Sequence, residues 1–119
     1  MFFEIENYQS LKSSVEELCD FLSSQNVRQE RVFDSKLALY ELLGNVLKHS
    51  DGKARVYGEL AQGFVELKIF SEKTFTPPTA SICSEVFSEH GRGLFLVDHV
   101  CDERGCTKDG GIYIRIKIE

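Results

Sequence analysis

The sequence predicts an α+β fold in which helices cover one face of a β-sheet, giving a two-layer sandwich. Two segments before residue 50 repeat their apolar residues at helical spacing, whereas residues 54–60, 64–70 and 112–118 alternate between apolar and polar. The expected order is strand, two helices, two strands, long loop, helix and terminal hairpin. This order predicts a mixed, mostly antiparallel sheet with the helices on one side.

The first strand and the first helix follow from two patterns near the start of the chain. Phe3 and Ile5 alternate with their neighbours, which predicts a short strand. An apolar stripe at four-three-four spacing then predicts a helix, and it consists of Leu11, Val15, Leu18 and Leu22. Ser14 and Glu17 have the spacing of a capping box within this helix.

A second, longer helix is expected from about Asn26 to His49. Its apolar residues fall on one side, and they include Val32, Leu39, Leu43 and Val46. After Asp51-Gly52 the spacing changes to two, so we expect a hairpin whose strands are separated by Ala61-Gln62-Gly63.

The remaining segments predict a loop, a helix and a final hairpin. Residues 71–90 lack a regular apolar spacing and contain several Ser, Thr and Pro residues, so we expect a long loop acting as a lid. A helix is expected from Leu94 to Val100. Lys108-Asp109-Gly110-Gly111 should then form a tight turn into a last strand, whose buried side is Ile112, Ile114, Ile116 and Ile118.

Composition restricts the class of protein. A chain of 119 residues with 42% hydrophobic and 28% charged residues fits one globular domain spanning 1–119. We expect no membrane span, because no apolar run is long enough, and a cytoplasmic location, because no signal peptide is visible. A net charge of −5 argues against nucleic-acid binding. The four cysteines lack CxxC spacing, and we expect reduced thiols.

Two short patterns carry candidate chemistry. Glu41, Asn45 and His49 are spaced four residues apart, so they share one side of the long helix, away from its apolar stripe. A solvated helix face is the alternative. The segment Gly91-Arg92-Gly93-Leu94 stands at a helix start, where backbone N–H groups can approach an anion. An ordinary turn into a helix is the alternative there.

In this order, the patterns resemble the GHKL (Bergerat, histidine-kinase-like) ATPase domain. Residues 40–49 are similar to its N box, and residues 90–97 are similar to its second glycine box. The small size points to the anti-sigma-factor serine/threonine kinase branch. The resemblance implies that Glu41 is the general base and that Asn45 ligates Mg²⁺. It also implies that Asn45, His49 and the segment Gly91-Arg92-Gly93-Leu94 bind ATP.

The resemblance fails on the adenine side. In the family, the strand before the lid ends in an Asp-x-Gly-x-Gly box, whose Asp reads the adenine amino group. Here Phe70 stands where that Asp is expected, and Glu72 and Thr74 replace the glycines. The family also has an adenine-reading threonine, and Ile112 stands near its position. We therefore expect weakened ATP binding, and we expect an Asp at position 70 to strengthen it.

The sequence thus predicts an anti-sigma-factor-like regulatory domain. The resemblance implies that it binds a sigma factor or an anti-sigma antagonist, forms a homodimer, and uses Mg·ATP to phosphorylate a serine or threonine of the antagonist. One alternative is a nucleotide-independent pseudo-ATPase that acts as a protein-interaction module. Another is the ATPase domain of a phosphorelay protein that transfers phosphate to histidine. Glu41 favours an enzyme, whereas Phe70 favours the module.

Overall fold

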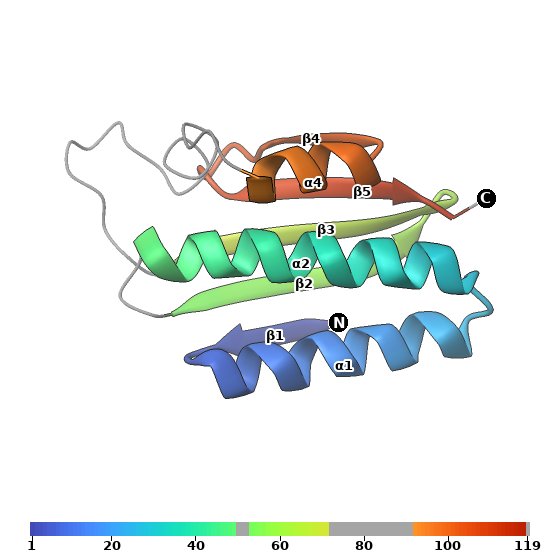
Figure 1. Ribbon diagram of the computed structural model, residues 1–119, viewed down its shortest axis with the longest axis horizontal. Helices are drawn as coiled ribbons and strands as arrows, with labels where there is room; N and C mark the ends of the chain where they lie inside the picture. The colour runs from blue at the N-terminus through green and yellow to red at the C-terminus, as the bar shows by residue number, and fades with distance from the viewer. Residues whose placement is uncertain (50–52, 72–91, 119) are drawn as a thin grey trace.

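The computed structural model describes residues 1–49, 53–71 and 92–118 (Figure 1). The expected lid, residues 71–90, lies outside these ranges except for Ser71. The described elements are β1 (Phe2–Ile5), α1 (Tyr8–Ser24), α2 (Gln29–His49), β2 (Ala54–Ala61), β3 (Phe64–Ser71), α4 (Arg92–Val100), β4 (Glu103–Cys106) and β5 (Ile112–Lys117). None of the helices in these ranges is long and apolar enough to cross a membrane.

The strands form one five-stranded sheet in the order β1-β2-β3-β5-β4. Every pair of neighbouring strands in the described sheet is antiparallel, so the parallel component of the expected mixed sheet is not found there. The three described helices lie on one side of the sheet (Figure 1). The predicted α+β class and its two layers are therefore confirmed.

The hydrophobic core lies between the sheet and the helices. The sheet contributes its alternate residues, which are Phe3, Ile5, Ala54, Val56, Val65, Leu67, Ile69, Ile112, Ile114 and Ile116. The helices contribute Leu11, Val15, Leu18, Leu22, Val32, Leu39, Leu42, Leu43, Val46 and Val97. Because burial of this apolar surface is the main favourable term in folding, the two periodicities seen in the sequence fix which face of each element is inside.

The start of α1 differs from the predicted capping box. Asn7 is the N-cap: its side chain accepts a hydrogen bond from the backbone N–H of Ser10, at 2.9 Å. The Ser10 hydroxyl in turn accepts one from the backbone N–H of Asn7, at 3.1 Å. Ser14 and Glu17 lie inside the helix, so their spacing was not a helix start.

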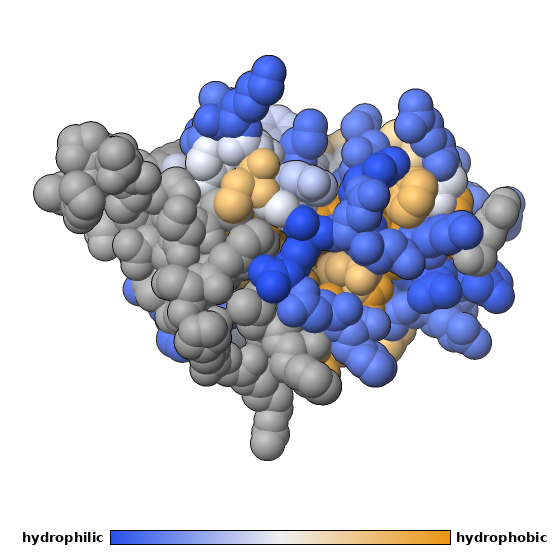
Figure 2. All heavy atoms as spheres, turned by 90° about the horizontal axis from the view of Figure 1, so that it is seen from above, coloured by the Kyte–Doolittle hydropathy of each residue, from blue (hydrophilic) through white to orange (hydrophobic). Residues whose placement is uncertain are grey.

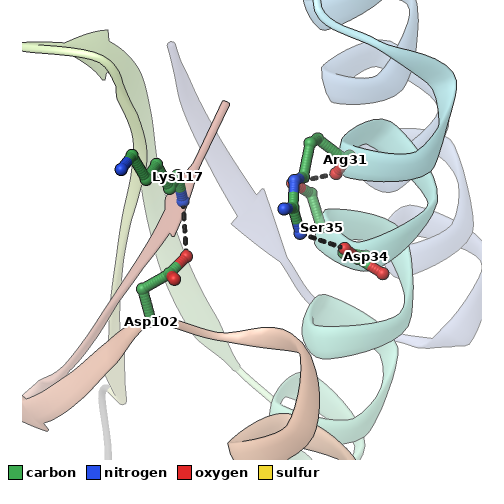
Figure 3. A network of polar contacts seen from close by, with 5 residues as sticks. All are labelled: Arg31, Asp34, Ser35, Asp102 and Lys117. Carbon is green, nitrogen blue, oxygen red and sulfur yellow. Dashed lines mark hydrogen bonds and ion pairs between the residues drawn. The ribbon is translucent and has the colours of Figure 1, made fainter. Parts of the chain in front are cut away.

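The second helix starts at Gln29, three residues later than predicted. Asn26 has a φ of 64°, and this left-handed conformation ends the turn after α1 instead of opening a new helix. In the first turns of α2, Arg31 forms an ion pair with Asp34 at 3.1 Å, and the buried hydroxyl of Ser35 donates to the carbonyl of Arg31 (Figure 3). The buried Ser35 hydroxyl therefore has an acceptor within its own helix.

Both hairpins have the turns that their sequences suggest. Gln62 and Gly63 have φ values of 53° and 82°, as in the two-residue turns that match the twist of antiparallel strands. Between β4 and β5, the backbone N–H of Gly111 donates to the hydroxyl of Thr107 at 2.8 Å, and Gly110 has a φ of 82°. In the first hairpin Ala61 belongs to β2 and pairs with Phe64, so the turn is one residue shorter than the predicted Ala61-Gln62-Gly63, and Val56 lies opposite Ile69.

Candidate functional site

The flank of α2 that faces α4 carries two of the predicted site residues. Helix α2 packs against α1 on one side and against α4 on the other (Figure 1). Asp34 lies close enough to Cys101, the residue after α4, to influence its pKa, so Asp34 marks the α4 side. Glu41 and Asn45 follow Asp34 by seven and eleven residues. At 3.6 residues per turn, both side chains leave the axis of α2 within about 20° of the direction of the Asp34 side chain. Both therefore lie on the flank that faces α4.

Glu41 and Asn45 are partly buried, between the fully buried Leu42 and Val46 and the solvent. Neither side chain makes a hydrogen bond or an ion pair within the described part of the chain. A partly buried carboxylate and amide without partners differ from an ordinary solvated helix face, because each retains the capacity to bind a ligand.

The first turn of α4 lies at the same end of the molecule as the C-terminal half of α2. The two helices contact each other and run in opposite directions (Figure 1). The predicted residues Arg92, Gly93 and Leu94 belong to this first turn. Their side chains and that of His49, as well as the whole of Gly91, are outside the described part of the structure. The backbone N–H groups at this end of α4 carry the partial positive charge that favours anions.

Phe70 is placed differently from what the resemblance implied. It lies on the outer face, the side of the sheet opposite the helices, because its neighbour Ile69 points into the core. Its ring contacts Tyr57 edge-on, with centroids 5.8 Å apart. The paired sheet separates it from α2, so Phe70 cannot line a pocket with Glu41. The structure thus places Phe70 and Glu41 on opposite sides of the sheet.

The other adenine-side residue, Ile112, is fully buried in the core. It lies opposite Ile69 and Cys106 in the sheet. Its apolar side chain is therefore explained by packing beneath the helices. In β3, strand alternation gives Ser71 the opposite orientation to Phe70, toward the side of the sheet that the helices cover. Ser71 is the last residue of β3.

The outer face carries further functional candidates that motif analysis missed. Two cross-strand pairs of β2 and β3 lie on this face. Arg55 is opposite Phe70, and Tyr57 is opposite Lys68. The signal was present in the alternation of β2, since Arg55 and Tyr57 flank the buried Val56. Seen from the β4 side, the described surface is mostly hydrophilic, with small apolar patches (Figure 2).

The cysteines differ in state. Cys19 and Cys101 are free thiols, as expected, but Cys106 is disulfide-bonded, which contradicts the expectation for that residue. Burial raises the pKa of the Cys101 thiol to about 12, and the carboxylates of Asp102, Asp98 and Asp34 act in the same direction. A thiol with such a pKa is protonated at neutral pH, so it is unsuited to act as a nucleophile.

No protein-family model matches this chain, and no curated protein matches it either.

Proposed function

We propose that this protein is a regulatory Mg·ATP-binding domain of the GHKL type, similar to anti-sigma-factor kinases. One observation carries the proposal: Glu41 and Asn45 lie partly buried on the flank of α2 that faces α4, and neither has a hydrogen-bond or ion-pair partner among the described residues. The two-layer architecture and the first turn of α4 at the same end of the molecule support it. Its partner would be a sigma factor or an anti-sigma antagonist, and it would act as a homodimer.

The donor chemistry of the flank fits the proposed ligand. The amide oxygen of Asn45 is a hard ligand of the kind that Mg²⁺ takes from proteins, and the bound metal would neutralise phosphate charge. The backbone N–H groups at the start of α4 would receive phosphate oxygens, since they carry partial positive charge. Glu41 would accept the proton of an attacking serine or threonine hydroxyl. Each group has one role, and the roles can be tested separately.

Calorimetric titration with Mg·ATP and Mg·ADP tests the proposal. We expect binding of both nucleotides by the natural chain, and at least a tenfold loss of affinity in Asn45→Ala, because the metal-linked part of binding is removed. Gln29→Ala is the matched control, since it removes an exposed amide from the other end of the same helix. Absence of binding by the natural chain, or equal affinities of the two variants, would refute the proposal.

The second candidate is a nucleotide-independent interaction module. The exposed aromatic residues Phe2 and Tyr57 on the outer face favour it, because they form a contact surface that does not involve α2. This candidate predicts no heat of binding with either nucleotide and partner binding that is unchanged in Asn45→Ala. The same calorimetric series therefore separates the two candidates.

A further inference from the structure

The outer face of the sheet contains a hollow of about 670 Å³ over β2 and β3. Its lining includes Arg55, Tyr57, Glu59, Glu66, Lys68 and Phe70. The size is within the usual range for ligand sites. Because these side chains alternate with core residues, the hollow lies on the opposite side of the sheet from Glu41 and Asn45.

Two aromatic rings, those of Tyr57 and Phe70, line this hollow, and the ring of Phe2 lies beside that of Tyr57. Phe2 is 48% exposed and Tyr57 is 41% exposed, and their ring centroids are 4.9 Å apart. Phe70 continues the row, in edge contact with Tyr57 at 5.8 Å. Three neighbouring rings on three strands, tilted relative to one another, provide an apolar surface that the sheet holds in place.

Two cations without partners lie among these rings. Arg55 stands beside Phe70 and Lys68 beside Tyr57, and neither makes an ion pair or a hydrogen bond within the described ranges. Glu4 lies opposite Arg55 on β1 but does not pair with it. The Nε atom of Arg55 is also buried without an acceptor. These cations are therefore available to an anionic group from outside the chain.

One neighbouring cation on the same face, Arg115, is engaged with carboxylates. Arg115 lies 3.5 Å from the carboxylate of Glu66 and 2.9 Å from that of Glu103, and its guanidinium stacks on Phe64 at 4.1 Å. Glu66 at the edge of the hollow therefore shares the Arg115 cation with Glu103. Glu59 lies beyond Tyr57 along β2, and the exposed Asp109 lines the hollow from the turn two residues before Gly111, so the two cations lie between carboxylates.

We propose that this surface binds an acidic, aromatic segment of a partner protein. An apolar side chain of the segment packs on Tyr57 and Phe70, and a neighbouring carboxylate is bound between Arg55 and Lys68. The charge complementarity specifies the occupant, because a basic or purely apolar segment would leave both cations without an acceptor. This site is independent of the proposed nucleotide site, since it lies on the other face of the sheet.

Titration of the ¹⁵N-labelled protein without nucleotide tests this site. The probe is the capped peptide Glu-Phe-Glu-Leu, and the controls are Lys-Phe-Lys-Leu and Glu-Ser-Glu-Ser. We expect saturable shifts of the amides of Arg55, Tyr57, Lys68 and Phe70 with the first peptide at up to about 5 mM, as befits a short ligand. Neither control peptide should saturate, and the amides of α2 should not shift.

Variants complete the test. Arg55→Gln combined with Lys68→Gln should lower the affinity for the acidic peptide at least tenfold. The matched control combines Lys12→Gln with Arg28→Gln, which removes two exposed cations from outside this face, and it should bind like the natural chain. Equal binding of the acidic and basic peptides, shifts confined to other elements, or an unchanged affinity in the first double variant would overturn the proposal. None of these outcomes depends on whether ATP binds.

Discussion

The ring of Phe70 lies over Gly111 on the outer face of the sheet, in the space that a side chain at position 111 would need. A β-carbon built at Gly111 would come within 2.5 Å of the ring and within 2.9 Å of the carbonyl oxygen of Ile69. Tyr113 covers Gly105 in the same manner, one strand further on. Glycine in these strands is therefore required by close approach of a neighbouring ring.

Gly111→Ala should lower the free energy of unfolding by about 1–3 kcal/mol, because the added methyl group must displace the Phe70 ring or the backbone. Gly44→Ala is the matched control. Nothing lies within 4 Å of its added β-carbon, and it is inside α2, so alanine should stabilise by about 0.5–1 kcal/mol. Urea unfolding of both variants measures these effects. Equal stabilities would contradict the packing of Phe70 over Gly111.

Phe70→Asp should leave nucleotide affinity unchanged, because position 70 is on the other side of the sheet from Glu41. Loss of the ring contacts should destabilise the protein by about 1–3 kcal/mol. Titration with Mg·ATP and urea unfolding measure the two effects separately. If the variant bound Mg·ATP more tightly, the placement of Phe70 on the outer face would be wrong.

Glu41→Gln should separate chemistry from binding. The amide keeps the shape of the side chain but cannot accept a proton, so phosphoryl transfer to a serine or threonine of an antagonist should fall about 10²–10⁴-fold. Nucleotide affinity should change little, in contrast to Asn45→Ala. Glu30→Gln, an exposed position in the first turn of α2, is the matched control and should keep the full rate. An unimpaired rate in Glu41→Gln would rule out Glu41 as the base.

Asn7→Ala should destabilise the protein by about 1 kcal/mol, because the N–H of Ser10 loses its acceptor at the start of α1. Ser14→Ala, which alters the capping residue suggested by the sequence, should change stability by less than about 0.5 kcal/mol. Thermal or urea unfolding distinguishes them. A larger effect at Ser14 than at Asn7 would contradict the observed helix start.

Cys101 should resist alkylation in the folded protein. Its pKa of about 12 exceeds the ordinary value of 9.0, so the thiolate fraction at pH 8 is about a thousandfold smaller than in the unfolded chain. The stability linked to this thiol is present below pH 9 and is lost as the pH rises toward 12. Iodoacetamide labelling, with peptide mapping and the denatured protein as reference, measures the difference. Equal labelling rates would show that Cys101 is not buried as described.

Burial decides which parts of the fold could be predicted from the sequence. Ile112, Ile114 and Ile116 are fully buried, so strand alternation identified their face correctly. The start of α1 could not be predicted in this way, because it depends on a side chain of Asn7 that competes for backbone N–H groups. The edge strand β4 has no apolar alternation, and the bounds Glu103–Cys106 follow only from its pairing with β5.

The candidate site, too, could be predicted only in part from the sequence. Helical spacing placed Glu41 and Asn45 on one side of α2, but only the tertiary arrangement shows that α4 is the neighbour on that side. Motif alignment gave no information on the face of the sheet on which Phe70 lies, because a shift of one residue in a strand moves a side chain to the opposite face. Spacing within an element is therefore informative, whereas the relation between elements has to come from the structure.

Contacts near Asp102 hold the C-terminal end of α4 to strand β5. The carboxylate of Asp102 accepts a hydrogen bond from the backbone N–H of Lys117 at 2.6 Å (Figure 3), and its own N–H donates to the carbonyl of Arg115 at 2.9 Å. Arg104 forms an ion pair with Asp98 in the last part of α4. Any displacement of α4 would therefore pivot about this end, so that the largest excursion would occur at Arg92, at the opposite end of the nine-residue helix, where the phosphates are proposed to bind.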